Sequence, residues 1–151
     1  MKISKKSRYG LRAMIELALH KDEGPIPARV ISKKQDIPLQ YLEQIFNKLK
    51  KEGLVNTSRG PNGGYLISRE PSKIKIKSII MALEGEDFLL DCLSSKKPSC
   101  KRSDNCRARR FWKKLGKGIS DILDSTTLQD LCKGPKAKEE AGIGHRYLFQ
   151  I

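Results

Sequence analysis

The sequence predicts a mainly α-helical protein with a small β-hairpin wing, in which a winged helix-turn-helix domain is followed by a long dimerisation helix. Three observations support this fold class. Helical apolar patterns fill the first 53 residues, a glycine-rich turn then separates two β-prone runs, and a heptad-like apolar seam follows Cys106. At 151 residues the chain can hold one compact domain, or a smaller domain with an extension that needs a partner, and the pattern favours the second.

The first third of the chain has the spacing of a helix-turn-helix. Apolar residues recur every three or four positions over residues 7–20, which predicts a first helix that Gly24 and Pro25 terminate. A short second helix is expected over residues 28–34. A third helix is expected from Leu39 up to the C-capping residue Gly53.

A β-hairpin directly after the third helix predicts a wing. Residues 54–59 and 65–69 are β-prone, and they are joined by the glycine-rich turn GPNGG at residues 60–64. Glycine has no Cβ, so the tip of such a turn can approach a surface closely. The winged helix-turn-helix domain is therefore expected to span residues 1–71, which end at Pro71.

The rest of the chain predicts an extension that pairs with a second subunit. We expect a connecting helix over residues 72–85, a cysteine-bearing loop over 86–105, a dimerisation helix and a short following helix over 106–132, and a C-terminal tail over 133–151. The apolar spacing after Cys106 is four, three, four and three, as in two packed helices. The expected assembly is a homodimer. Its seam would contain Ala108, Trp112, Leu115, Ile119 and Ile122.

The charge of the chain points to a polyanionic partner. The formal net charge is +14, from 31 Lys and Arg against 17 Asp and Glu, and nucleic acid is the leading candidate. A membrane is disfavoured, because the basic residues do not lie opposite a broad apolar face and no stretch is long enough to span a bilayer. No signal-peptide core follows Met1, so the expected location is the cytoplasm. The Cys and His residues form no recognisable catalytic motif, and the chain is not expected to be an enzyme.

The third helix and the wing offer side chains that can read DNA. In a major groove, Gln pairs with adenine, Glu accepts from cytosine, and Lys reaches guanine or phosphate. Arg59 at the wing tip suits the minor groove, and Lys5, Lys6 and Arg8 suit phosphates. A solvated polar face is the alternative, but the preceding helix and the following wing favour DNA. The candidate DNA-binding residues are Arg8, Gln40, Tyr41, Glu43, Gln44, Asn47, Lys48, Arg59, Gly60 and Pro61.

Several motifs closely resemble the IscR, NsrR and RirA family of bacterial repressors. They are the Arg8-Tyr9 pair, YLEQIF at residues 41–46, LKKEGLV at residues 49–55 and RGPNGGYL at residues 59–66, and the resemblance extends without gaps from Met1 to about Leu83. It implies a homodimer in which the third helix enters the major groove and the wing at residues 59–61 touches the minor groove. Such a homodimer would bind double-stranded DNA at a roughly palindromic operator.

Three cysteines form a second constellation. Cys92, Cys100 and Cys106 are separated by seven and five residues, in the expected loop and at the start of the seam helix. Thiolates are the standard ligands of iron-sulfur clusters. Structural zinc also uses three cysteines with a fourth ligand, so the residues alone leave a cluster, zinc and thiol-only sensing open. The resemblance implies that these three cysteines ligate an iron-sulfur cluster, because cluster-binding members carry three cysteines at this place.

The fourth ligand departs from the family pattern. IscR-type members have a histidine three residues after the third cysteine, where this chain has Arg109, and the acidic ligand of NsrR-type members would fall at Arg8. Neither side chain can ligate iron, so a 2Fe-2S and a 4Fe-4S cluster both stay open. Cys132 is expected to be a buried structural cysteine rather than the substitute. The possible substitutes are Glu84, Glu86, Asp87, Asp91, Asp104, Cys132 or an exogenous small molecule.

The predicted function is a sequence-specific DNA-binding transcriptional regulator whose operator affinity is controlled by an iron-sulfur cluster that senses iron, redox or nitric oxide status. Cluster assembly is expected to order residues 86–105 against the dimer helix, because a metal stabilises only the conformation that holds its ligands together. The alternatives are a winged-helix regulator with zinc or thiol-only cysteines, or one that responds to an effector protein. The sequence leaves open whether the regulator represses or activates.

Overall fold

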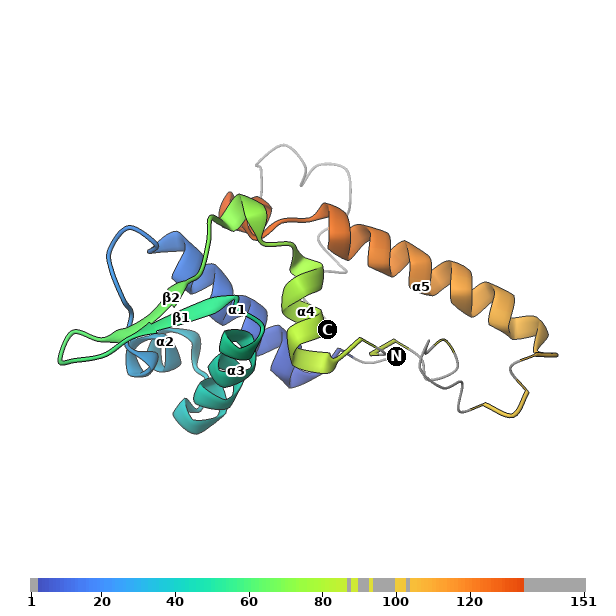
Figure 1. Ribbon diagram of the computed structural model, residues 1–151, viewed down its shortest axis with the longest axis horizontal. Coiled ribbons are helices and arrows are strands. Elements are labelled where there is room, and N and C mark those ends of the chain that lie inside the picture. Colours follow the sequence, from blue (N-terminus) through green and yellow to red (C-terminus); the bar gives the residue numbers. More distant parts are fainter. Residues whose placement is uncertain (1–2, 87, 90–92, 94–99, 103, 135–151) are drawn as a thin grey trace.

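A computed structural model describes residues 3–86, 88–89, 93, 100–102 and 104–134, and Figure 1 shows its arrangement. The chain is mainly helical and contains one two-stranded antiparallel sheet in the described residues, as the sequence predicts. None of the helices in this part of the chain is long and apolar enough to cross a membrane. The helices and strands, in chain order, are α1 (Lys5–Leu19), α2 (Ala28–Gln35), α3 (Leu39–Lys51), β1 (Val55–Ser58), β2 (Gly64–Ile67), the short 3-10 helix η1 (Pro71–Lys73), α4 (Ile76–Glu84), α5 (Arg107–Ser125) and α6 (Leu128–Cys132).

Local chemistry accounts for where the first three helices begin and end. The hydroxyl of Ser4 caps α1 by accepting a hydrogen bond from the N–H of Ser7 at 3.3 Å. Asp36 ends α2 in the left-handed conformation, with φ of 51°, which makes the tight turn before α3. Gly53, with φ of 69°, turns the chain from the end of α3 toward β1. The three helices therefore begin and end within a few residues of the bounds expected from the sequence.

The core of the winged helix lies where the apolar stripes of these helices meet. Met14 of α1, Ile31 of α2, Phe46 of α3 and Ile79 of α4 are all fully buried. The ring of Phe46 also stacks on Tyr65 of β2, with ring centres 4.2 Å apart. One core contact therefore fixes α3 relative to the wing.

Helix α4 packs closely on α1 because α1 has a glycine at the crossing. A Cβ added at Gly10 would lie 2.2 Å from Cδ1 of Leu83 and 3.4 Å from Cγ2 of Ile45. A side chain at Gly10 would force the buried side chain of Leu83 to move. The connecting helix expected within residues 72–85 is α4, which begins at Ile76 after η1 and a short extended piece and ends before Gly85.

One carboxylate is buried between α1 and α2. Glu16 is 5% exposed and accepts hydrogen bonds from Lys34 and from Gln35, the latter at 2.9 Å, while Nε2 of His20 lies 3.0 Å away. Burial alone would raise the pKa of Glu16, but these hydrogen bonds and the charges of Lys34 and His20 outweigh it, so the pKa lies below its ordinary value. Glu16 is therefore ionised at neutral pH and holds α2 against α1.

Helix α5 extends away from the winged helix, and its C-terminal end is anchored to it (Figure 1). The N–H of Ile76 donates to the carbonyl of Thr126 at 2.9 Å, and the N–H of Leu128 donates to the carbonyl of Ile74 at 2.8 Å. The side chain of Leu128 is fully buried in the core. None of the 19 residues of α5 is buried. The helix is therefore held at its base, and the rest of its length is half-buried or exposed.

Candidate DNA-binding face and cysteine site

Helix α3 separates its apolar and polar residues cleanly. Its apolar residues Leu42, Ile45, Phe46 and Leu49 are buried. Five of the predicted DNA-binding residues of this helix are exposed, namely Gln40, Glu43, Gln44, Asn47 and Lys48. The sixth, Tyr41, is half-buried and packs edge-on against Tyr9 of α1, with ring centres 5.8 Å apart. Tyr41 therefore supports α3 from its side, and the five exposed residues form the face that can enter a groove.

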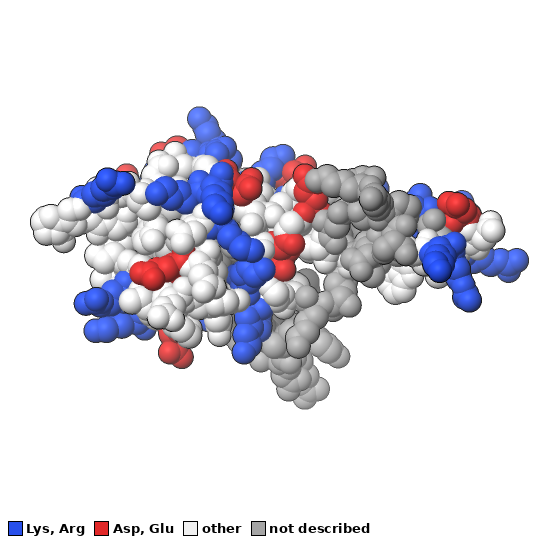
Figure 2. All heavy atoms as spheres, turned by 60° about the horizontal axis from the view of Figure 1, so that its bottom comes forward, with Lys and Arg blue, Asp and Glu red and all other residues white. Residues whose placement is uncertain are grey.

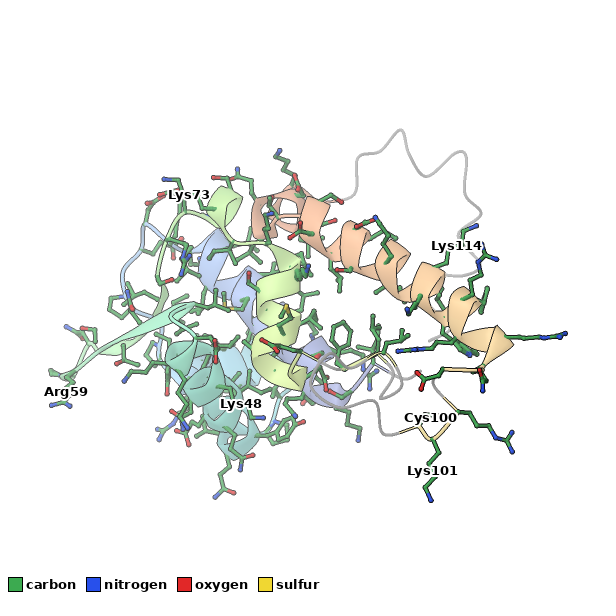
Figure 3. The ribbon with its side chains drawn as sticks, turned by 45° about the vertical axis from the view of Figure 1, so that its right-hand side comes forward. Lys48, Arg59, Lys73, Cys100, Lys101 and Lys114 are labelled. Atoms are coloured by element: carbon green, nitrogen blue, oxygen red, sulfur yellow. The ribbon has the colours of Figure 1, made fainter. Side chains whose placement is uncertain are left out.

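The wing carries Arg59 at its exposed tip (Figure 3). Gly60 has a φ of 107°, and the N–H of Gly63 donates to the carbonyl of Gly60 at 2.9 Å, which closes the turn. A Cβ at Gly63 would lie 2.4 Å from the carbonyl oxygen of Ser58, so this turn requires glycine at that position. Arg59 and its exposed neighbours, Gly60 and Pro61, therefore project beyond the core on a tight hairpin.

A groove runs between the start of α2, the start of α3 and the wing. It is lined by Arg29 and Val30 of α2, by Glu43 of α3 and by Tyr65 of β2, among others. Both residues of α2 are exposed beside the predicted DNA face, and neither is among the residues predicted from the sequence. Their position in the first turn of the second helix could have predicted a place near DNA, because that helix crosses the DNA backbone in helix-turn-helix proteins. Arg8 is also exposed, on α1.

Two of the three predicted cluster ligands are described. Cys100 and Cys106 are half-buried and have free thiols, and Cys106 is the residue that precedes the first turn of α5. Figure 3 places Cys100 below the start of α5, at the opposite end of the molecule from Arg59. Cys92 lies outside the described residues. Among the residues that are described, no group of three or more His, Cys, Asp or Glu side chains could hold a metal ion.

Basic residues lie close in sequence to the two described thiols. Figure 2 shows Lys and Arg at the tip formed by the start of α5, as well as over the winged helix. Soft thiolate donors suit an iron-sulfur centre, and surrounding cations offset the negative charge of a thiolate-bound cluster. The described donor set therefore fits such a group in its chemistry. The exposed cations nearest in sequence to the thiols are Lys101, Arg102, Arg107 and Arg110.

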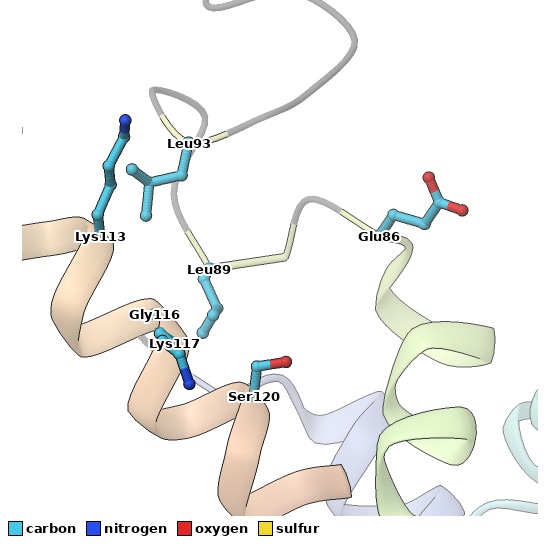
Figure 4. A pocket seen from close by; sticks show the side chains of 7 residues that line it. All are labelled: Glu86, Leu89, Leu93, Lys113, Gly116, Lys117 and Ser120. Carbon is cyan, nitrogen blue, oxygen red and sulfur yellow. The ribbon is translucent and has the colours of Figure 1, made fainter.

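The described residues from the cysteine region contact the middle of α5. Leu89 and Leu93 face the side of the helix that carries Gly116, and they border an open cavity of about 300 Å³ (Figure 4). A Cβ added at Gly116 would lie 3.3 Å from Cδ1 of Leu93 and 3.7 Å from Cδ1 of Leu89. Gly116 therefore permits this close approach. Lys113 and Lys117 border the same cavity.

The structure narrows the candidates for a fourth ligand. Glu84 already accepts hydrogen bonds from the hydroxyls of Ser4 and Ser7. Cys132 follows the far end of α5, and a helix of 19 residues is about 28 Å long, so Cys132 and Cys106 of one chain cannot share a centre. Burial raises the pKa of the Cys132 thiol, as suits a structural cysteine. Glu86 and Asp104 are the described carboxylates that stay candidates, and Asp87 and Asp91 lie outside the described residues.

A helix-turn-helix with an exposed polar third helix and a hairpin wing defines a winged-helix DNA-binding protein. The pattern of the Rrf2 family, described as "Iron-dependent Transcriptional regulator", matches residues 3–134, and the chain belongs to this family. It is a transcription regulator and not an enzyme.

Individual relatives agree with this assignment. The chain is 38% identical to the HTH-type transcriptional regulator IscR of Xenorhabdus nematophila over 141 residues, which cover 93% of this chain and 85% of the relative. Among solved structures, it is similar to T. potens IscR, with 35% identity, a TM-score of 0.71, and coverage of 99% of this chain and 96% of that one. It is also similar to CymR (YrzC), the global cysteine regulator of B. subtilis, with 35% identity, a TM-score of 0.73, and coverage of 90% and 99%.

Proposed function

We propose that this chain is a sequence-specific DNA-binding regulator whose operator affinity is controlled by an iron-sulfur cluster bound to Cys92, Cys100 and Cys106. The observation that carries the proposal is the pair of half-buried free thiols at the start of α5, in a cation-rich part of the chain. The description of the family as iron-dependent supports an iron-containing effector. The regulator would act in the cytoplasm, where bacterial DNA is.

In this proposal α3 and the wing read the DNA together. The exposed polar face of α3 enters the major groove, where Gln40, Gln44 and Asn47 can bond to base edges. Arg59 reaches the minor groove from the wing tip. The stacking of Phe46 on Tyr65 keeps the wing at a constant distance from α3, so the two elements engage adjacent grooves of one duplex.

A second copy of the chain covers the apolar side of α5 in this proposal. The side chains of Phe111, Trp112 and Ile122 are 59%, 37% and 66% exposed in the single chain. Such exposure on a helix without buried residues is typical of an interface between subunits. A symmetric dimer presents two α3 helices, and it therefore binds a roughly palindromic operator.

Binding of a cluster by the cysteines would affect α5, because residues near the thiols are attached to that helix or pack against it. An iron-sulfur cluster, when bound, supplies a centre that responds to redox change, nitric oxide and iron supply. Cys106 is attached directly to the start of α5, and Leu89 and Leu93 pack against its middle. Ligation would therefore tie the cysteine region to α5, and release of the thiols would loosen it.

The proposal is tested by anaerobic purification followed by iron and sulfide analysis, visible absorption and Mössbauer spectroscopy. Cys106→Ala is expected to lose the visible absorption while the winged helix still melts cooperatively. Cys132→Ala is the matched control and is expected to keep the absorption, because Cys132 lies at the other end of α5. Operator affinity is then measured for cluster-loaded and cluster-free protein. Equal affinities would refute control by the cluster and leave DNA binding intact.

A regulator without a cluster is the second candidate function. It is favoured by Arg8 and Arg109, which stand where ligands would be expected from the family resemblance. In this case the cysteines would bind zinc or act as thiols, or an effector protein would replace the metal. Anaerobically isolated protein that is colourless and cannot be reconstituted with iron and sulfide would favour this candidate.

A further inference from the structure

The base of the wing is joined to the segment that leads into α2. The N–H of Ile26 donates to the carbonyl of Tyr65 at 3.0 Å, and the N–H of Tyr65 donates to the carbonyl of Ile26 at 2.9 Å. A Cβ added at Gly64 would lie 2.3 Å from the backbone of Ile26 and 2.6 Å from the nitrogen of Pro27, so the two backbones are in direct contact. Because Tyr65 also stacks on Phe46 of α3, the start of α2, the wing and α3 hold fixed positions relative to one another.

The groove where these three elements meet has one cation in its lining. Its volume is about 530 Å³, and Arg29 and Glu43 are the charged residues among the described residues that line it. Both are exposed. Within the described part of the chain, the guanidinium group of Arg29 makes no hydrogen bond or ion pair, whereas Arg12 of α1 and Lys34 of α2 both take part in the contact between these two helices. The packing of the winged helix therefore does not use the charge of Arg29.

The shape of a DNA duplex indicates what this groove would hold. Two neighbouring grooves of a duplex are separated by one sugar-phosphate strand. When α3 lies in a major groove and the wing lies in the adjacent minor groove, this strand must pass between α3 and the wing. The wing extends past α2 and α3 (Figure 1), with Arg59 at its tip (Figure 3), and the groove between the wing and α3 is the one that Arg29 lines. The strand would therefore meet Arg29 as it crosses from one groove of the duplex to the next.

We propose that this groove receives the sugar-phosphate strand that separates the major from the minor groove, and that Arg29 binds a phosphate of that strand. The proposal rests on the proposed DNA-reading roles of α3 and the wing. A guanidinium group suits a phosphate because it has a permanent charge and several N–H donors in a fixed plane. Glu43 lines the same groove and repels phosphates, and Arg29 offsets this repulsion. A contact to phosphate fixes the position of the duplex without reading its sequence.

The test measures the affinity of the full chain for a duplex selected from a random library and for a scrambled duplex of the same length, over a range of salt concentrations. Arg29→Gln is expected to weaken binding to both duplexes by roughly five-fold at low salt, the upper end of exposed ion pairs. The slope of log affinity against log salt concentration is expected to fall by about one per bound protomer, because one phosphate contact is lost. Arg29→Lys keeps the charge and should keep the slope. Lys73→Gln, which removes an exposed cation on the far side of the winged helix from α3 (Figure 3), is the control and should leave the slope unchanged.

The outcomes separate a phosphate contact from the other roles of Arg29. A loss confined to the selected duplex would mean that Arg29 reads a base, and an unchanged salt slope, or a slope that falls equally in Arg29→Lys, would mean that its charge does not bind phosphate; each result overturns the proposal. Gln44→Ala on the exposed face of α3 tests the proposed function separately, because it should weaken binding to the selected duplex more than to the scrambled one. If it does so while Arg29→Gln has no effect, only the Arg29 proposal fails. If the wild-type chain prefers no duplex, the reading role of α3 fails and the Arg29 proposal fails with it.

Discussion

The exposed side of α5 makes the proposed dimer quantitatively testable at Ile122, which exposes 66% of its surface in the single chain. Full burial of an isoleucine side chain stabilises by about 1.5–3 kcal/mol, so covering the exposed part is worth about 1–2 kcal/mol per protomer. A two-fold dimer contains two such contacts, which together contribute about 2–4 kcal/mol. Ile122→Ala removes most of this contribution. We therefore expect the dimer dissociation constant to rise roughly 30- to 800-fold.

Sedimentation velocity over a wide range of protein concentrations measures this constant directly. Leu19→Ala is the matched control, because Leu19 is 53% exposed on α1, outside the seam, and should not affect association. Both variants are expected to keep the wild-type helix content, since neither side chain belongs to the core. The reasoning is refuted if the wild-type protein is monomeric at all concentrations, or if Ile122→Ala weakens association no more than Leu19→Ala does.

Three further predictions concern the wing, the contact between α1 and α4, and the buried carboxylate. Arg59→Ala is expected to weaken duplex binding by about 1–3 kcal/mol in a fluorescence anisotropy titration; Lys73→Ala, an exposed cation on the far side of the winged helix from α3 (Figure 3), is the charge control, and equal losses in both would contradict a specific role of the wing. Gly10→Ala is expected to lower the free energy of unfolding in urea by up to about 2 kcal/mol, because its Cβ would overlap Leu83 and this cost exceeds the roughly 1 kcal/mol that alanine gains over glycine inside a helix; a stability above wild type would contradict the observed packing. Glu16→Gln is expected to lower the melting temperature at pH 7. The folded-state pKa of Glu16 lies below the ordinary value of 4.5, so its stabilisation is present above that value and is lost as the pH falls through the lower folded-state pKa. The difference from wild type should therefore shrink below pH 4.5, and a constant difference down to pH 3 would argue against this role.

The elements that depend on local periodicity could be predicted from the sequence. The residues that indicate α1, α3 and the wing lie within a few positions of each other in the sequence. The bounds of these elements therefore follow from the apolar spacing and from the glycines. The docking of α6 could not be predicted in this way. It depends on the backbone pairing of Lys75 with Thr127 and on burial of Leu128, which join segments about fifty residues apart. Such pairings leave no periodic trace in either segment.

The same distinction holds for the candidate sites. The polar face of α3 follows from helical spacing, and five of its six predicted residues are exposed. Helical spacing also places Tyr41 off the apolar stripe with a hydroxyl that could bond to DNA, and only its contact with Tyr9 shows that it supports the helix. The contact of Glu84 with Ser4 joins residues 80 positions apart, and no property of either residue indicates it in the sequence.

The distance between the cysteines and the DNA-reading face restricts how one could affect the other. Cys106 begins α5 and Arg59 lies at the opposite end of the molecule, so no direct contact joins them within one chain (Figure 3). The two ends of α4 are attached to α5 and to the cysteine region, respectively. At its start, the N–H of Ile76 bonds to Thr126 at the base of α5, and at its end Gly85 leads into the cysteine region. Because Gly10 brings α4 into close contact with α1, a displacement at either end of α4 would be transmitted to the packed winged helix as a rigid movement rather than absorbed by a loop.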